Sequence, residues 1–386
     1  MRTHPPRPPL PLLLLALGAA GCLTPRAAER PDEDGGQGPP AREVVMEPLR
    51  IRLAPDPELG LTDFDASTLF HEGLRLQEAQ QCEAALRFYD RLLAEFSDSR
   101  YLSAAAFNAG RCLETLGRLE EALARYRRVT EGLPRSKDWV DALFREAECL
   151  AALGRHAEAV SDLGRLLARA DLPVSDRVDG QVLLGENHLA RGDTLAAEQE
   201  LRTALRLFRA HERDEFLDPA PAARAEHRLA ELATARFEAA PLRPPEAQLQ
   251  ADLEAKAQLL LEAQNAYLRS MRYGDPDWAT ASGFRIGQLY LALHRAMEAA
   301  PLPEDLSPEE ADLYRDLLRK RTAVLLRKAL RVFEMTAQLG ERTGTDNDWT
   351  RKVRDEMQRV EQLVLSQLEP LPEPPPPPPA EGPGNS

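Results

Sequence analysis

The sequence predicts an all-helical protein, an α-solenoid in which antiparallel helix pairs stack on one another. One observation is a set of small residues that recur 37, 37 and 38 positions apart, at Gly73, Gly110, Ala147 and Gly185. A second is an alanine twelve positions after each of them, at Ala85, Ala122, Ala159 and Ala197. Proline and glycine are rare inside each half copy. A fixed period of this length is typical of stacked helix pairs.

The second copy illustrates the packing that the pattern predicts. Apolar residues recur at three- and four-residue steps from Phe107 to Leu116, which gives a first helix one apolar stripe. Gly117 suits the left-handed conformation that ends such a helix, and a second stripe follows it. Gly110 and Ala122 are small enough for the two helices to cross closely. Each pair leaves apolar surface that only the next copy can bury, as in a solenoid.

The register of the copies resembles the tetratricopeptide repeat. In the second copy, the positions that this family prefers hold Gly110, Leu113, Gly117, Ala122, Tyr126 and Pro134. Ser97 and Asp171 stand where a closing proline is usual, and Gln80 replaces the turn glycine of the first copy. The slightly longer copies are similar to repeats of bacterial envelope proteins, including Tol-Pal-associated and outer-membrane-assembly lipoproteins. The resemblance implies a fold and says little about chemistry.

Residues 1–22 resemble a bacterial lipoprotein signal peptide. Two arginines precede an apolar run from Leu10 to Ala20, which is too short to cross a bilayer core as a helix. The run ends in Ala19-Ala20-Gly21-Cys22, which is similar to the box whose cysteine is acylated. The resemblance therefore implies a lipid on Cys22, and Leu23 after it favours the outer membrane. The alternative is an ordinary secretory signal with a coincidental cysteine.

The rest of the chain divides into segments that differ in composition and in the helical spacing of their apolar residues. Residues 23–60 are predicted to be a disordered tether rich in proline and glycine, with one short element at most. Four regular repeats occupy residues 61–210, and two degenerate repeats with a capping helix occupy residues 211–369. A polyproline tail fills residues 370–386. This tail is read as a ligand for an aromatic groove, a spacer near the cell wall or a passive end.

Five helices are expected after the regular repeats, at residues 222–239, 247–272, 278–299, 305–339 and 346–368. In the third of them, Gly287 takes the small position. Ser307 is a favourable N-cap for the fourth helix, and Gly340 and Gly344 are expected to close it. Ala329 and Phe333 repeat the step from an alanine to a large residue four positions later.

Charge and cysteine content exclude some classes of partner. The net charge of −14 argues against nucleic acid, because no stripe of lysine and arginine is visible, and it disfavours adsorption to anionic lipid. Besides Cys22, the chain has Cys82, Cys112 and Cys149, which we expect to be small buried apolar residues rather than a disulfide. There is no CxxC motif, so a zinc site is not expected.

No catalytic motif stands out. The sequence contains no HExxH, no GxSxG, no P-loop and no Rossmann glycine run. Carboxylates alternate with arginines, as in Arg118-Leu119-Glu120-Glu121, which is typical of solvated helix faces. We therefore predict a protein that is not an enzyme, with no cofactor, no metal and no small-molecule substrate.

A stripe of large apolar residues stands three positions before the small residues. Its members are Phe70, Phe107, Phe144, Val182 and, in the degenerate region, Phe284. In the tetratricopeptide family this position faces the concave groove that holds partner peptides. Neighbouring groove positions hold Leu74, Arg111, Glu148 and Glu186, with Asp141 and Asp179 alongside. Such a groove suits a peptide with apolar anchors and some positive charge. The alternative is that the stripe only packs between successive helix pairs.

The features together predict a scaffold lipoprotein, anchored in the outer membrane through Cys22 and facing the periplasm. Its expected partners are envelope proteins or peptides in the groove, within a machine for outer-membrane assembly, pilus or secretin assembly, gliding motility or Tol-Pal function. The alternative function is a cell-wall-associated enzyme, or an activator of a peptidoglycan enzyme, that docks through its repeats.

Overall fold

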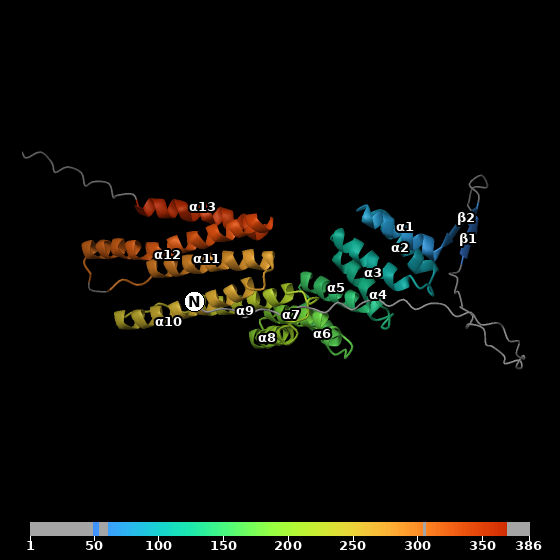
Figure 1. Cartoon of the computed structure of the whole chain (residues 1–386), viewed down its shortest axis with the longest axis horizontal. Helices are drawn as coiled ribbons and strands as arrows, with labels where there is room; N and C mark the ends of the chain where they lie inside the picture. The colour runs from blue at the N-terminus through green and yellow to red at the C-terminus, as the bar shows by residue number, and fades with distance from the viewer. Residues whose placement is uncertain (1–48, 54–60, 304–305, 369–386) are drawn as a thin grey trace, which may run out of the picture. The chain divides into compact units, whose positions relative to one another are not determined.

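The computed structural model describes residues 49–53, 61–303 and 306–368. Thirteen helices and two short strands make up this part of the chain, and the helices form pairs in chain order (Figure 1). The predicted all-helical repeat fold is confirmed. Cys22, the signal peptide, the polyproline tail and all of the predicted tether except residues 49–53 lie outside the described residues. None of the described helices is long and apolar enough to span a membrane.

Four pairs of similar length come first. They are α1 (Ala66–Glu78) with α2 (Cys82–Glu95), α3 (Leu102–Thr115) with α4 (Leu119–Thr130), α5 (Trp139–Ala152) with α6 (His156–Leu167), and α7 (Val174–Ala190) with α8 (Thr194–Ala210). Each second helix also packs against the first helix of the following pair. The apolar face that one pair exposes is therefore covered by the next, as a solenoid requires.

The helices that follow are longer. They are α9 (Ala220–Ala239) with α10 (Glu246–Met271), α11 (Pro276–Glu298) with α12 (Pro308–Thr343), and α13 (Asp348–Leu368), which packs on α11 and α12 (Figure 1). All five helices expected in this region are present, with ends that differ from the predicted ones by four residues or fewer.

The ends of α12 show one correct and one wrong prediction. Ser307 is the N-cap, and its hydroxyl and the carboxylate of Glu310 form a reciprocal capping box. The expectation that Gly340 closes this helix is wrong, because the helix runs through Gly340 and ends at Gly344, whose φ is 67°. Gly340 instead makes room for Thr350 of α13: a Cβ atom there would lie 2.9 Å from Cγ2 of the threonine.

Two strands precede the helices, where the sequence predicted one short element at most. Strand β1 (Leu49–Leu53) lies antiparallel to β2 (Leu61–Asp65), with Leu49 opposite Asp65 and Leu53 opposite Leu61. Strand β1 falls in the stretch that was expected to be a disordered tether. Its apolar and basic residues alternate, which is the period of a strand, but five residues give too weak a signal among the surrounding prolines.

The turns inside the regular pairs follow the predicted glycines. Gly117, Gly154 and Gly192 all adopt the left-handed conformation, with φ of 73°, 72° and 83°. In the first pair Gln80 takes this place with φ of 59°, so the turn is kept without a glycine. The three described cysteines, Cys82, Cys112 and Cys149, are free and buried, as expected.

In several pairs the core is organised around a glycine of the first helix. A Cβ atom at Gly73 would lie 2.7 Å from Cε1 of Tyr89, and Gly185 and Leu201 are placed in the same way. Gly287 lies against the ring of Phe333, so a lengthened pair uses the same close contact as the regular ones. The large partners Tyr89 and Phe333 are fully buried.

Candidate partner-binding face

The first helices of the pairs are α1, α3, α5, α7, α9 and α11, and we call their shared side the first-helix face. The predicted stripe lies on all of them except α9. Phe70 stacks on Tyr101 of the next pair, with ring centroids 4.9 Å apart and 20° between the ring planes. The ring of Phe107 lies 5.8 Å from that of Tyr126. Phe144 packs on the core of the third pair. All three phenylalanines are only partly buried, so each both packs and presents an edge to solvent.

Val182 is different, because its side chain is fully buried in the core that α7, α8 and α9 share. Val182 therefore does not line a groove, and at this copy the packing alternative is correct. The shorter side chain fits entirely between the pairs, where a phenylalanine would project. Phe284 is half-buried between Phe333 and Trp349, with ring centroids 6.0 and 5.6 Å away.

Two hollows on the first-helix face collect predicted groove residues. Leu74 of α1 and Arg111 of α3 line a hollow of about 280 Å³. Glu148 of α5 and Glu186 of α7 line another of about 260 Å³, together with Arg224 of α9. The structure thus brings Leu74 to Arg111 and Glu148 to Glu186, in two separate hollows rather than in one continuous cluster.

Negative charge gathers where α5 faces α7. Burial raises the pKa of Asp179, and the nearby carboxylates of Glu148, Glu186 and Asp176 raise it further, against the opposing effect of Arg224. The pKa of Asp141 is also raised, by partial burial and by Asp176 and Asp138. Both ionised carboxylates therefore lack sufficient positive charge around them. We call Asp141, Asp176 and Asp179, together with Glu148, the acidic patch; of the four, Glu148 pairs with Nη1 of Arg145 at 2.7 Å.

The charge of Glu186 is compensated more fully than that of the patch, because two arginines of α9 donate hydrogen bonds to its carboxylate. Its Oε1 atom accepts hydrogen bonds from Nε of Arg224 and Nε of Arg228, both at 2.7 Å. Glu231, on the same helix as the two arginines, accepts from Arg228 at 2.7 Å and from Arg285 of α11 at 2.9 Å. Alternating charges therefore connect α7, α9 and α11 across the first-helix face.

These partners of Glu186 were not predicted from the sequence. The signal that would have found Arg224 is its distance of 38 residues from Glu186, one repeat length, which places both residues at like positions of neighbouring first helices. Arg285 lies 54 residues from Glu231, so the longer helices of this region hide the same relationship.

A buried histidine lies on α9, the helix that supplies the central charges of these ion pairs. His227 contacts the rings of Tyr267 and Trp278, at centroid distances of 5.2 and 5.1 Å, and its Nδ1 lies 2.9 Å from Oγ of Ser282. Burial lowers the pKa of His227 to about 4, although Glu231 acts in the opposite direction. The imidazole is therefore neutral at physiological pH and serves the packing of α9 against α11.

The described residues contain no group of three or more His, Cys, Asp or Glu side chains placed to hold a metal ion. What the first-helix face offers is contact surface: exposed edges of phenylalanines, two shallow hollows and an undercompensated acidic patch. Such surfaces bind peptides through apolar anchors and complementary charge.

A comparison with family models gives one match, to the tetratricopeptide repeat, over residues 141–171. These residues cover most of α5 and all of α6. The third pair is similar to a tetratricopeptide repeat. This match supports the predicted resemblance for that copy, and the tetratricopeptide register agrees with the helix pairs on either side of it. No match was found among curated proteins.

Solved structures with a similar backbone fold have low sequence identity to this protein. The apo form of RapI is 11% identical, with 78% of this chain and 98% of that chain covered and a TM-score of 0.43. The C-terminal part of a TPR repeat-containing protein from Cytophaga hutchinsonii is 10% identical, with 78% and 99% covered and a TM-score of 0.42. MamA from Desulfovibrio magneticus RS-1 is 15% identical, with 52% and 94% covered and a TM-score of 0.38.

Proposed function

We propose that this protein is a non-enzymatic scaffold that binds partner proteins on its first-helix face. The observation that carries the proposal is the acidic patch beside the exposed edge of Phe144. Burial first, and neighbouring carboxylates second, raise the pKa of Asp141 and of Asp179. A partner lysine or arginine placed against them stabilises their ionised forms, because an opposite charge favours the ionised carboxylate. An apolar side chain of the same partner then covers the phenylalanine edge.

The site of action that we propose is the cell envelope. The support is the sequence of residues 1–22, whose apolar run and terminal Cys22 resemble a lipoprotein signal. Acylation of Cys22 with more than one chain gives stable anchoring, where a single chain binds reversibly. We infer a lipoprotein of the outer membrane that faces the periplasm and contributes its repeats to an envelope machine.

The scaffold proposal is tested by removing the charge of the acidic patch in the full-length protein. Asp141→Asn with Asp179→Asn is compared with Asp355→Asn and Glu361→Gln, which remove the same charge from exposed positions of α13. Partners are crosslinked in cells, purified with the protein and quantified by mass spectrometry. We expect a specific partner to be depleted several-fold by the first double variant alone. Equal recovery of that partner with both double variants would contradict the proposed role of the acidic patch.

The anchor is tested separately with Cys22→Ala. We expect the variant to leave the outer-membrane fraction and to incorporate no labelled palmitate. Continued fractionation with the outer membrane, together with palmitate uptake, would show that the lipid is not on this cysteine. This result would leave the partner-binding proposal standing, because the two tests use different residues and different measurements.

A further inference from the structure

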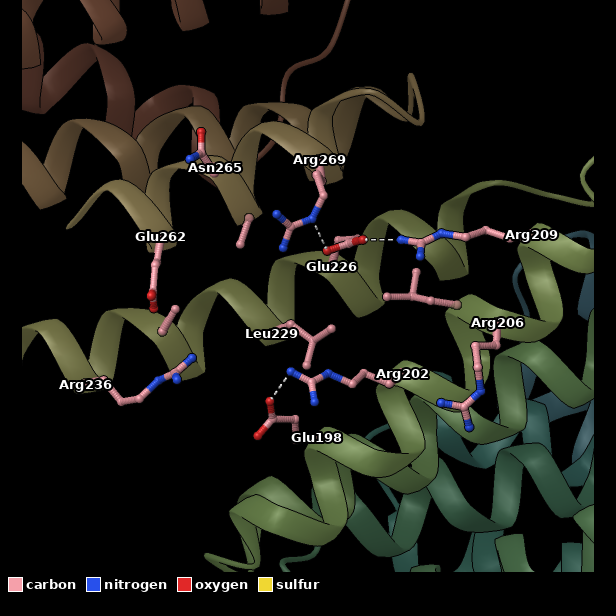
Figure 2. Close-up of a pocket in the computed structure, with 13 residues that line it drawn as sticks. Glu198, Arg202, Arg206, Arg209, Glu226, Leu229, Arg236, Glu262, Asn265 and Arg269 are labelled. Carbon is pink, nitrogen blue, oxygen red and sulfur yellow. Dashed lines mark hydrogen bonds and ion pairs between the residues drawn. The ribbon is translucent and has the colours of Figure 1, made fainter. Parts of the chain in front are cut away.

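A cleft of about 620 Å³ opens between α8, α9 and α10, away from the predicted stripe (Figure 2). Five arginines and three glutamates line it, so the cleft carries an excess of positive charge in a chain whose net charge is −14. We call it the arginine cleft, after Arg202, Arg206, Arg209, Arg236 and Arg269. A local charge of opposite sign to the whole chain calls for a ligand or a structural explanation.

Part of the cleft is fixed by one buried carboxylate. Glu226 of α9 is 2% exposed, and it accepts hydrogen bonds from Nη2 of Arg209 at 2.9 Å and from Nε of Arg269 at 3.0 Å. The two arginines come from α8 and α10, and both remain largely exposed (Figure 2). A guanidinium has five N–H donors, so each keeps donors that face the cleft while its position is held. This part has a structural explanation and is also preorganised for an anion.

Arg202 pairs with Glu198, its Nη2 lying 2.6 Å from Oε1 of the carboxylate, but the positive charge of Arg206 and Arg236 has no structural explanation. Within the described residues, no ion pair involves Arg206 or Arg236, and Arg206 donates a hydrogen bond only to the hydroxyl of Thr203, at 2.8 Å. Figure 2 shows both side chains at the border of the cleft, on α8 and α9. Two exposed guanidinium groups without a carboxylate partner are therefore available to a ligand.

The cleft also has apolar surface. Leu205, Ala233 and Ala266 are buried side chains that form part of its lining. On α10, Leu261 and Leu268 are 54% and 36% exposed. They stand four residues before and three residues after Asn265, which lines the cleft, so they lie along the border of the cleft-lining side of the helix. A ligand that follows α10 would contact both leucines after it leaves the cleft.

We propose that the arginine cleft binds an acidic, leucine-containing segment of a partner protein. Its volume lies in the range of about 300–1,000 Å³ that ligand sites occupy, and a single guanidinium group recognises a carboxylate with two parallel hydrogen bonds. A nucleic acid fits less well, because the cleft has no aromatic side chain for stacking bases and because Glu198 and Glu262 stand on its border. This second docking surface extends the scaffold role proposed above and uses different residues from the acidic patch.

The test measures binding of a fluorescein-labelled helical peptide of glutamate and leucine to the full-length protein by fluorescence anisotropy. Arg206→Glu with Arg236→Glu reverses the two unpaired charges of the cleft. Arg327→Glu with Arg331→Glu makes the same change at exposed positions of α12 and serves as the matched control. Neither changed arginine of the cleft holds an ion pair with a described residue, so the fold should persist, and thermal melting of each variant checks this.

We expect the wild-type protein to bind the peptide, the cleft variant to bind it at least about tenfold more weakly, and the control to bind as the wild type does. A peptide with glutamine in place of glutamate should lose a similar factor. No binding by the wild-type protein, or equal losses in both variants, would overturn the proposal. Tighter, cleft-dependent binding of a single-stranded oligonucleotide would overturn it in favour of nucleic acid. Asp141→Asn with Asp179→Asn should bind the peptide normally, which separates a failure of the cleft from a failure of the acidic patch.

Discussion

A Cβ atom added to Gly110 would lie 2.5 Å from Cε1 of Tyr126. The missing side chain lets α3 approach α4 closely enough for the tyrosine ring to fill the space between them. Tyr126 is fully buried, so this contact lies in the core of the second pair. The same relationship recurs between Gly73 and Tyr89, which makes it a repeated requirement of the fold.

Gly110→Ala is therefore expected to destabilise the protein by about 1–3 kcal/mol, the cost of overpacking a filled core. Gly164→Ala on α6 is the matched control, because a Cβ atom there would meet nothing within 4 Å. The control should stabilise the protein by up to about 1 kcal/mol, since alanine favours a helix interior. Urea unfolding of both variants measures the two effects. A Gly110→Ala variant as stable as the control would show that the pairs do not depend on this contact.

Acid should weaken the packing around His227. Its pKa is about 4 in the folded chain and about 6.5 in the unfolded one. The unfolded chain binds a proton between these values while the folded chain does not, so stability is lost as pH falls from about 6.5 to 4. The loss from this group is about 3 kcal/mol. His227→Phe should reduce the decline of the unfolding free energy between pH 7 and pH 4 by about that amount. An unchanged decline would mean that the imidazole is not held neutral.

The contribution of Asp179 to stability should change with pH in the opposite direction to that of His227. Its pKa is raised in the folded chain, so its ionised form disfavours folding, and this cost disappears as pH falls through the folded pKa. Asp179→Asn should therefore raise the melting temperature at pH 7, and the difference from the wild type should shrink in acid. The same variant should bind a cationic partner more weakly, which is a typical trade between stability and function. A lower melting temperature at pH 7 would contradict the raised pKa.

The buried thiols should resist alkylation in the folded protein. Burial raises the pKa of Cys112 and of Cys149 to about 12, so neither forms a thiolate near neutral pH. In a Cys22→Ala protein, iodoacetamide should react slowly under native conditions and with all three remaining cysteines in urea. Mass spectrometry of the labelled peptides measures the rates. Rapid native labelling of Cys112 would place it at an accessible surface, against the fold described above.

The regular pairs were predictable because their key contacts are local in sequence. Gly110 and Tyr126 are sixteen residues apart, and the same spacing repeats, so one chain shows the pattern several times. The capping box at Ser307 and Glu310 was predicted in part for the same reason: the N-cap serine is a local signal, and it was the residue predicted. Val182 was misplaced because the register gives its position but not how deeply its shorter side chain sinks between the pairs.

The candidate binding surfaces were less predictable because their residues come from different pairs. Glu226 is 17 residues from Arg209 and 43 from Arg269, separations that match no single repeat length. In the sequence these residues look like ordinary solvated charges on helices. Only the packing of α8, α9 and α10 shows that one carboxylate is buried while the arginines around it remain exposed.

Site-specific photo-crosslinking in living cells tests the central claim, partner binding on the first-helix face, most directly. Photoreactive residues replace Phe107 and Phe144, and a control probe replaces Asp355, which is exposed on α13. We predict a discrete adduct from the first two positions and none from the control. Silence at Phe107 and Phe144, with adducts only from α13, would show that the phenylalanines serve packing alone and that partners bind the C-terminal helices instead.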